Sequence, residues 1–329
     1  MSDEILEQTF QVAAPARLKL SNIRGSVEIQ AGDPGVISVH AVKHNGSNRQ
    51  TTIEMSQSED GTVVVETREP EAAWRLLSFS SPAKVDYKVS VPPSCSLRIS
   101  CVSSSMSMTG ISGDFSLHTV SGSVSLQQLT GPLKINSVSG NVTGSQLTGE
   151  LSLETVSGDI RLDDSDLPSV HGSTVSGDLY LHTALGGGPY KLNSVSGDVH
   201  FVVPADTACT AEVHGVSGNL TTTLPLTTQI RRGGSSTVQI QGGGVPVKLS
   251  SVSGDLWIGQ PGDEPSKGQS EAFIPSTPPV APMPPAPPMP PAPPEPPVSQ
   301  PTPLTTAEIL AMVERGELSV DEAIRRMQR

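Results

Sequence analysis

Four aspartates that lie close together in the sequence are the strongest candidates for acid–base chemistry: Asp159, Asp163, Asp164 and Asp166. Pairs of carboxylates hydrolyse glycosidic bonds when they converge on one groove, one as the acid and the other as the base or nucleophile. Here no aromatic platform for a sugar accompanies the acids, and two of them fall at a predicted corner, where solvated acids are common. We therefore expect the protein not to be an enzyme.

The histidines and cysteines of the sequence do not indicate a metal site or a reactive thiol. Seven histidines are present, but none has the spacing of metal ligands. Representative histidines are His118, His171, His182 and His200. Three cysteines, Cys95, Cys101 and Cys209, are too few and too irregular for a disulfide framework or a zinc site. We expect no metal and no cofactor, and a structural role for the cysteines.

A ladder of hydroxyl side chains is the most regular polar feature, because each pair flanks a valine of a recurring unit. The pairs are Thr119 and Ser121, Ser137 and Ser139, Thr155 and Ser157, Thr174 and Ser176, and Ser194 and Ser196. Stacked in a repetitive fold, they would form a flat polar strip. Such a strip could bind a repetitive surface such as ice, a glycan or another copy of the fold, or it could only solvate a sheet face.

The elements that carry these residues are nine-residue repeats between residues 102 and 164. In order they read VSSSMSMTG, ISGDFSLHT, VSGSVSLQQ, LTGPLKINS, VSGNVTGSQ, LTGELSLET and VSGDIRLDD. Positions one, five and seven are apolar except at Gly144, and six of the seven repeats have Gly at position three. In an extended strand these odd positions face one side and the even ones face water. Because nine is odd, the alternation must reset once per repeat, and we place this corner near positions eight and nine.

A strand and a corner at a fixed short period are typical of a β-solenoid, in which each turn buries its apolar side against the next. Valine-led and leucine-led repeats alternate, which predicts an all-β, single-stranded β-solenoid with about 18 residues in each two-strand rung. Later copies begin at Val175, Val195, Val216 and Val252 with longer spacing, and we predict corner loops for the extra residues. The fourth position varies too much for a calcium-binding ladder.

The flanking segments define the expected domains. Residues 1–100 alternate without the nonapeptide and are predicted to form an N-terminal β-hairpin cap, which protects the edge of the solenoid at 101–259. Residues 260–303 are proline-rich and are predicted to form an extended polyproline II linker. Residues 304–329 contain two capping boxes on either side of Gly316, which predict a C-terminal helical hairpin.

The predicted hairpin has an apolar face on each helix, made by Ile309, Leu310, Val313, Ile324 and Met327. Helices this short are marginal in water, so these faces need something to bury against. Self-association or the capture of a protein partner explains both hairpin and linker. Docking on the solenoid is the alternative, although a long spacer would then be an unnecessary detour.

Charge and hydropathy limit the classes of partner and the cellular locations that we expect. Acidic residues outnumber basic ones by 33 to 21, giving a net charge of −12, and no basic stripe is evident. Nucleic acid is therefore not an expected partner. The N-terminus is acidic, no apolar signal region follows it, and no stretch reaches the ~20 apolar residues of a membrane span. The sequence predicts a cytoplasmic protein, with a location peripheral to the cell envelope as the alternative.

The recurring S-V-S-G-D/N units, together with the leader from Leu20 to Ile29, resemble the bacterial and archaeal putative-adhesin β-solenoid family over roughly residues 10–259. That family includes envelope-stress proteins of the LiaX type, and the segment at 304–329 is similar to the short helical hairpin that accompanies such proteins. The resemblance implies a non-catalytic, adhesin-like scaffold or interaction protein with a link to envelope stress. A glycan-binding or glycan-active solenoid is the alternative function.

Overall fold

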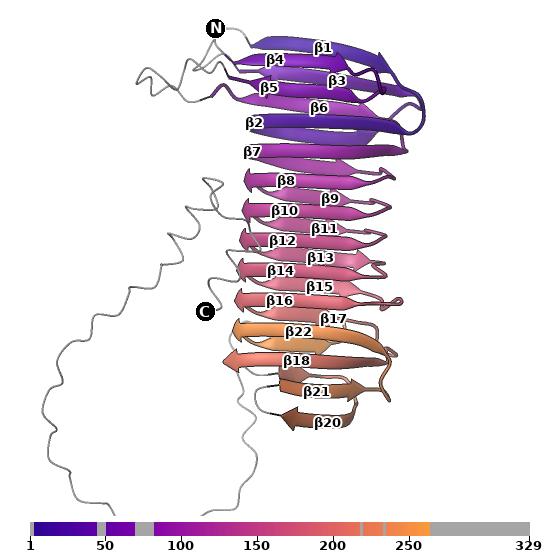
Figure 1. Cartoon of the computed structure of the whole chain (residues 1–329), viewed down its shortest axis with the longest axis vertical. Coiled ribbons are helices and arrows are strands. Elements are labelled where there is room, and N and C mark those ends of the chain that lie inside the picture. The colour runs from indigo at the N-terminus through magenta and orange to yellow at the C-terminus, as the bar shows by residue number, and fades with distance from the viewer. Residues whose placement is uncertain (1–2, 45–50, 70–81, 218–219, 233–234, 264–329) are drawn as a thin grey trace, which may run out of the picture.

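The computed structural model describes residues 3–44, 51–69, 82–217, 220–232 and 235–263. These residues form 23 β-strands that belong to one continuous hydrogen-bonded sheet. The predicted all-β solenoid is thus confirmed (Figure 1). The predicted proline-rich linker lies almost wholly, and the helical hairpin entirely, outside the described residues.

No helix within the described ranges is long and apolar enough to cross a lipid bilayer.

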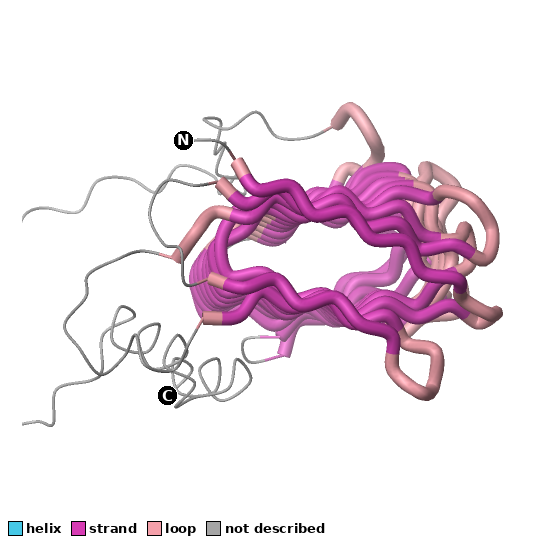
Figure 2. The backbone as a smooth tube through the Cα atoms, turned by 90° about the horizontal axis from the view of Figure 1, so that it is seen from above, coloured by secondary structure: helices cyan, strands magenta, loops and turns pink. Residues whose placement is uncertain are grey.

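Each rung consists of one long strand and one short strand, which face each other across a flattened interior (Figure 2). The long strands are β8 (Phe115–Ser121), β10 (Leu133–Ser139), β12 (Leu151–Ser157), β14 (Val170–Ser176), β16 (Tyr190–Ser196), β18 (Cys209–Ser217) and β22 (Val245–Ser253). The short strands are β9 (Val124–Gln127), β11 (Val142–Ser145), β13 (Ile160–Ser165), β15 (Leu179–Thr183), β17 (Val199–Val202), β19 (Leu220–Thr222) and β23 (Leu256–Gly259). Long strands pair with long strands and short with short, in parallel.

The pairing register places equivalent residues of successive rungs directly beside each other. Leu133 of β10 pairs with Leu151 of β12, which confirms a rung of 18 residues. Leu151 pairs with Val170 of β14, so the next rung is one residue longer. Neighbouring strands lie ~4.8 Å apart, so each position of the repeat becomes a straight column along the solenoid. Leucine, isoleucine and valine columns from both sheets fill the interior.

The corners differ from the single corner per repeat that the sequence predicted. In the valine-led repeats a corner does fall at position nine, where Gln146 and Asp164 have positive φ angles. In the leucine-led repeats the long strand runs through positions eight and nine without a break, as β12 shows. Glycine at position three makes the other corners instead of pointing into the core.

Gly140 shows why these corners require glycine. Its φ of +136° is a backbone conformation that side chains of L-residues rarely adopt, and an added Cβ would overlap the carbonyl oxygen of Gly122 in the preceding rung. The close approach allows Gly140 to donate its amide hydrogen to Ser157 of the following rung, at 3.0 Å. The recurring glycine is therefore the residue that lets rungs stack at a turn.

Because the long strand continues through the repeat boundary, its alternation also continues. In β12, Leu151, Leu153 and Thr155 face the interior, whereas Val156 falls on the outer side. The prediction that the leading valines are core residues was therefore wrong. Val102 is 46% exposed, and Val138, Val156 and Val175 are buried without belonging to the interior cluster.

Two strands bend from one sheet into the other at the N-terminal end. These are β2 (Ala16–Ala31) and β7 (Cys95–Thr109), which pair in parallel from Ala16 with Cys95 to Gln30 with Thr109. Stacking in the solenoid register thus begins at residue 16, within the region predicted to be only a cap.

Five further strands close this end of both sheets: β1 (Glu4–Gln11), β3 (Val36–Lys43), β4 (Thr52–Gln57), β5 (Val63–Arg68) and β6 (Val85–Val91). Strands β5 and β6 pair in parallel with β2, and β4, β3 and β1 are added to them in antiparallel pairs. On the long-strand side β2 is followed by β5 and β4, and on the short-strand side by β6, β3 and β1. Both sheets therefore end in an antiparallel pair of strands.

The C-terminal end has a rearranged strand order. Strand β22 lies between β16 and β18, with Ser253 paired to Ser196 on one side and to Ser217 on the other. The residues between β19 and β22, predicted to be a corner loop, form an antiparallel hairpin of β20 (Leu226–Arg232) and β21 (Ser235–Ile240). This hairpin pairs with β18 and covers the last rung.

The assigned register can be tested at neighbouring positions of β12. Leu153 is 1% exposed and belongs to the core, whereas Ser152 lies on the outer face. We predict that Leu153→Ala lowers the free energy of unfolding by ~2–5 kcal/mol through the cavity it leaves, and that Ser152→Ala changes it by less than about 0.5 kcal/mol. Urea unfolding of both variants measures the difference, and equal losses would contradict the register.

The glycine corner can be tested with a matched pair of alanine substitutions. We predict that Gly140→Ala destabilises the fold by at least about 2 kcal/mol, because the new Cβ forces both the positive φ and the stacked carbonyl to change. Gly187→Ala should change stability by less than about 0.5 kcal/mol, since a Cβ there meets open space. Thermal unfolding followed by circular dichroism separates them. A Gly140 variant as stable as the wild type would show that stacking does not depend on this corner.

Candidate functional site

The aspartates considered for catalysis hold the corners together. Asp159 accepts a hydrogen bond from the backbone amide of Asp178 at 3.0 Å, and Asp178 accepts one from the amide of Asp198 at 3.0 Å. Asn141 begins this series and Asp255 continues it in the next rung. The aspartate of the recurring unit thus satisfies an amide of the following rung, which is a structural role.

The remaining acids of the cluster do not converge either. Asp163 forms an ion pair with Arg161 at 2.9 Å, and a carboxylate oxygen of Asp164 lies 3.1 Å from Nδ1 of His182 on the neighbouring strand. Within the described ranges, no three His, Cys, Asp or Glu side chains are grouped so that they could hold a metal ion.

The paired hydroxyls predicted to form a flat strip differ in burial. The first member of each pair is buried: Thr119, Ser137, Thr155, Thr174 and Ser194. The second member is at least partly exposed: Ser121, Ser139, Ser157, Ser176 and Ser196. The double strip was therefore a wrong prediction: the strand does not turn between positions nine and one, so the first hydroxyl points into the interior, and the second lies at the end of the strand beside the glycine corner. Only a single serine column reaches the surface.

The buried hydroxyls have an unusual property. The Oγ atoms of Ser137, Thr155, Thr174 and Ser194 have no hydrogen-bond partner among the described residues. A buried hydroxyl without a partner costs ~1–3 kcal/mol, so this column weakens the solenoid interior. These buried hydroxyl groups cannot contact a ligand bound at the surface.

The cysteines are also interior residues. Burial raises the pKa of Cys95 and of Cys101 to about 12, and that of Cys209 to about 11. Their thiols are free and protonated at neutral pH, so they are poor nucleophiles and poor metal ligands. The structural role predicted for them agrees with this environment.

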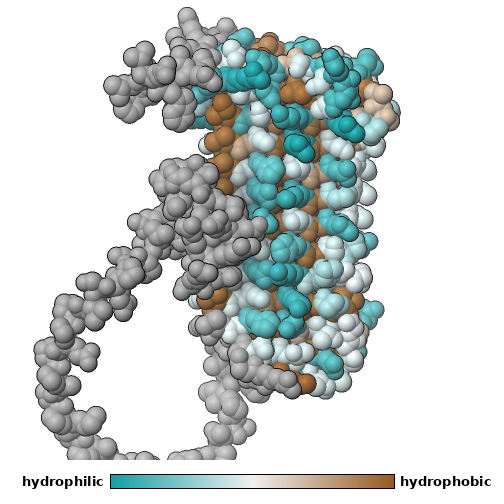
Figure 3. Space-filling view, viewed as in Figure 1, coloured by the Kyte–Doolittle hydropathy of each residue, from teal (hydrophilic) through white to brown (hydrophobic). Residues whose placement is uncertain are grey.

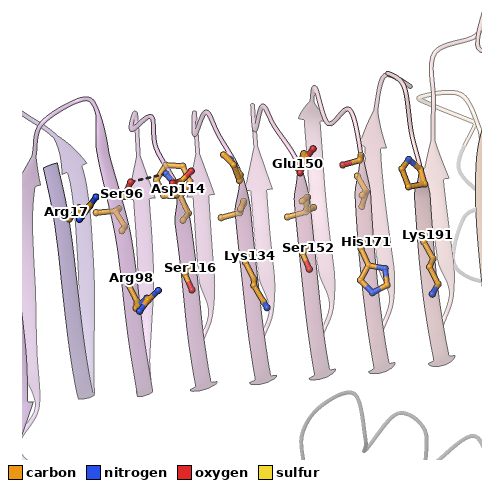
Figure 4. Close-up of a pocket in the computed structure, with 18 of the residues that line it drawn as sticks. Arg17, Ser96, Arg98, Asp114, Ser116, Lys134, Glu150, Ser152, His171 and Lys191 are labelled. Atoms are coloured by element: carbon orange, nitrogen blue, oxygen red, sulfur yellow. Dashed lines mark hydrogen bonds between the residues drawn. The ribbon is translucent and has the colours of Figure 1, made fainter. Parts of the chain in front are cut away.

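The outer surface of the long strands is the candidate functional site, and we call it the long-strand face. It carries a column that we call the basic ladder, at position six of the leucine-led repeats and their equivalents. Its members are Lys19, Arg98, Lys134, His171, Lys191 and Lys248, with Ser116 and Ser152 between them. Figure 4 shows Arg98, Lys134, His171 and Lys191 in one row across successive strands.

An open groove of about 1190 Å³ follows the basic ladder. Its lining includes six Lys or Arg side chains and three carboxylates, in a chain whose net charge is −12. The ends of the ladder are neutralised, since Lys19 pairs with Glu66 at 3.2 Å and Lys248 with Glu212 at 2.9 Å. Arg98, Lys134 and Lys191 form no ion pair with any described residue.

A second column of polar side chains runs beside the basic ladder, and it includes one carboxylate, Glu154, between Asn136 and Ser173. In it, His118 lies within hydrogen-bonding distance of Asn136, at 3.2 Å, and Asn193 donates to Ser173 at 3.3 Å. Partial burial holds the pKa of His118 below its usual range, and the cations Lys134 and Arg98 lower it further. Figure 3 shows such polar side chains in columns along the long axis.

A third column is apolar, and we call it the valine ladder. It consists of Ile23, Val102, Val120, Val138, Val156, Val175, Val195 and Val252. Val102 is the most exposed of them, and Ile23, Val120, Val195 and Val252 are partly exposed. The top of this ladder lines a second groove, of about 450 Å³. An aliphatic column on the outside of a sheet is uncommon on a protein surface unless something packs on it.

Sequence reasoning missed the basic ladder and placed the valine ladder inside the fold. Within the seven nonapeptides only Lys134 of the ladder is a cation, so the repeats themselves carry no basic signal. The other members come from the leader and from the irregular later rungs. Alignment of the 18-residue rungs, instead of nine-residue units, would have brought Lys134, His171 and Lys191 into one column.

The unpartnered hydroxyls can be tested by comparing two buried threonines. We predict that Thr155→Val leaves stability unchanged or raises it by ~1 kcal/mol, because a methyl group replaces a hydroxyl that has no partner. Thr183→Val should cost ~1–3 kcal/mol, since the Oγ1 of Thr183 accepts from the amide of Leu167 and donates to the carbonyl of Ala184. Urea unfolding of both variants is the measurement. A loss at Thr155 equal to that at Thr183 would show that its hydroxyl is hydrogen-bonded.

Comparison with solved structures gives distant likenesses. A putative cell adhesion protein from Clostridium sporogenes is 12% identical, over 78% of this chain and 100% of that chain, with a TM-score of 0.25. A putative adhesin from Bacteroides fragilis is 11% identical, over 78% and 97% of the two chains, with a TM-score of 0.45. A putative lipid binding protein from Parabacteroides distasonis is 11% identical, over 78% and 96%, with a TM-score of 0.41.

No curated protein sequence matches the chain significantly. The sequence profile of the Toastrack DUF4097 family matches residues 16–258, a range that begins with β2 and ends within β23. These limits coincide with the part of the chain that stacks in the solenoid register. The chain therefore belongs to the Toastrack DUF4097 family.

Proposed function

We propose that the protein is a non-catalytic interaction scaffold whose segment at 304–329 docks on the valine ladder of its own solenoid. The observation that carries this proposal is the position of Val102, an aliphatic side chain that is 46% exposed on the outer face of a strand. The equivalent position is aliphatic in every long strand from β2 to β16 and in β22. A monomer gains nothing from such a column unless an apolar surface covers it.

The chemistry of the predicted hairpin fits the ladder. Each of the two predicted helices would present a narrow apolar face, with Ile309, Leu310 and Val313 on the first and Ile324 and Met327 on the second. Short helices of this kind need tertiary packing to persist. A row of valines with a period of ~4.8 Å offers a shallow aliphatic surface on which such faces can be buried.

The path of the chain explains why docking on its own solenoid needs a long spacer. In the sequence alone the length of this spacer was an argument against such docking. Strand β23 ends at Gly259 on the short-strand side, opposite the long-strand face. To reach the valine ladder the chain must pass around the solenoid, and the ladder extends over seven steps of ~4.8 Å, about 34 Å. As polyproline II, the residues from 264 to 303 could span up to ~120 Å, so every rung is within reach.

Because the segment at 304–329 is attached to its own solenoid, docking within one molecule is favoured over docking on a second copy. A tethered segment has an effective concentration in the millimolar range for a linker that can span the sites. At micromolar protein concentrations, docking within one molecule therefore outcompetes the same contact between molecules. In this proposal the scaffold is switched between a closed form and an open form with a free hairpin. The link to envelope stress and a cytoplasmic location remain predictions beside it.

Hydrogen exchange on the full-length protein tests this docking. We predict that the amides of 304–329 are protected in the wild type, and that Ile309→Asp with Ile324→Asp removes the protection because charges cannot be buried on the ladder. Val102→Gln with Val120→Gln should have the same effect from the other side of the contact. Both variants should retain the melting temperature of the solenoid.

Ser121→Gln with Ser139→Gln is the matched control, since it changes the neighbouring serine column by the same side chain. It should leave the protection intact. An unprotected hairpin in the wild type would contradict the docking. A dimer in sedimentation velocity that both the hairpin and the valine variants dissolve would show instead that the hairpin binds a second copy.

A further inference from the structure

The basic ladder is a second surface of the long-strand face, with a chemistry different from that of the valine ladder. Its three free cations, Arg98, Lys134 and Lys191, project outward from rigid strands and have no ion-pair partner among the described residues. Strand pairing fixes their positions. A row of fixed, unpaired cations over an open groove fits an extended anionic ligand better than a compact one.

The spacing of the ladder defines the ligand further. Arg98 and Lys134 are separated by two rungs, as are Lys134 and His171, so these groups lie ~10 Å apart. From Arg98 to Lys191 there are five rung steps, which is about 24 Å. This spacing fits a linear polymer with separated anionic groups.

The surroundings of the ladder favour a carbohydrate over a nucleic acid. On one side lies the polar column, in which Glu154 and the half-buried Asn193 can bond to sugar hydroxyls, whereas His118 and Asn136 bond to each other. On the other side, Pro132, Pro189 and Pro246 offer apolar contact to the carbon face of a sugar ring, and Asp114 and Glu150, which line the groove in the same column, can accept from sugar hydroxyls. The aromatic rings that line the groove, Phe115 and Tyr190, are buried and cannot stack on nucleic-acid bases.

We propose that the basic ladder binds a linear, carboxylate-bearing polysaccharide along the solenoid axis, with its anionic groups on Arg98, Lys134 and Lys191. The sugar hydroxyls meet the neighbouring polar column. Because the cations are exposed and the chain as a whole is acidic, binding depends on local charge and weakens as salt screens it. This goes beyond the scaffold function proposed above and does not depend on the hairpin, because the two ladders share no residue.

The test measures binding of end-labelled polygalacturonate oligomers to the full-length protein by fluorescence anisotropy, at low and at physiological salt. The ladder variant is Arg98→Gln, Lys134→Gln and Lys191→Gln together. Its matched control removes three cations from the short-strand side: Lys84→Gln, Lys88→Gln and Arg161→Gln. A neutral linear glucan and a 20-nucleotide thymidine oligomer are the competing probes.

We expect the ladder variant to bind polygalacturonate at least about tenfold more weakly than the wild type, with a smaller salt dependence, and the control variant to bind like the wild type. Equal binding by both variants, or wild-type binding no tighter than to the neutral glucan, would overturn the inference. Tighter binding of the thymidine oligomer would assign the ladder to nucleic acid instead. The ladder variant leaves the valine ladder unchanged. Hydrogen exchange at 304–329 in this variant therefore reports on hairpin docking independently of polysaccharide binding.

Discussion

In-register parallel stacking is the constraint on which every other feature depends. Each long strand bonds to the equivalent strand one rung away, so a residue type chosen at one position of the repeat is multiplied into a column. Stacking is possible only if the corners also stack, and at Gly140 the carbonyl of the preceding corner occupies the place of a Cβ. The glycine and the aspartate of the recurring unit therefore serve the backbone: the glycine lets two turns approach, and the carboxylate satisfies an amide of the next turn.

The repeat made the architecture predictable but not the orientation of every column. The rung length and the inward positions of Leu153 and Ile160 followed from alternation alone, because these residues lie in the middle of strands. The valine position failed because the two kinds of nonapeptide were treated as equal. Position nine is a corner with positive φ at Asp164 but an interior strand residue at Thr155. Both are polar residues that follow an acidic residue and a leucine, so composition does not distinguish them, and only the paths of complete rungs do.

The long-strand face combines two kinds of chemistry on a support that does not deform easily. On a loop, a cation such as Lys134 would be free to find a carboxylate, and in a chain with 33 acidic residues it would find one. On a strand flanked by equivalent strands, its Cα is fixed and its neighbours are determined by the register. The same rigidity keeps the aliphatic column outside, because turning one valine inward would require a shift of the entire strand. A surface of this kind can hold charges apart from their counter-charges and apolar groups in water, which is what recognition requires.

The position of β22 between β16 and β18 has a consequence for biosynthesis. A chain that emerges from the ribosome in order presents β18 before its neighbour in the finished sheet exists, whereas all earlier rungs can add one after another. Until residue 253 has been made, the edge of β16 lacks its native partner, and β18 carries a similar serine-ended strand that could occupy it. The rung of β22 and β23, which is synthesised last, therefore completes the stack by insertion between two rungs made earlier. Growth of the solenoid ends by insertion and not by addition at its tip, so its length is set by the topology of the last strands.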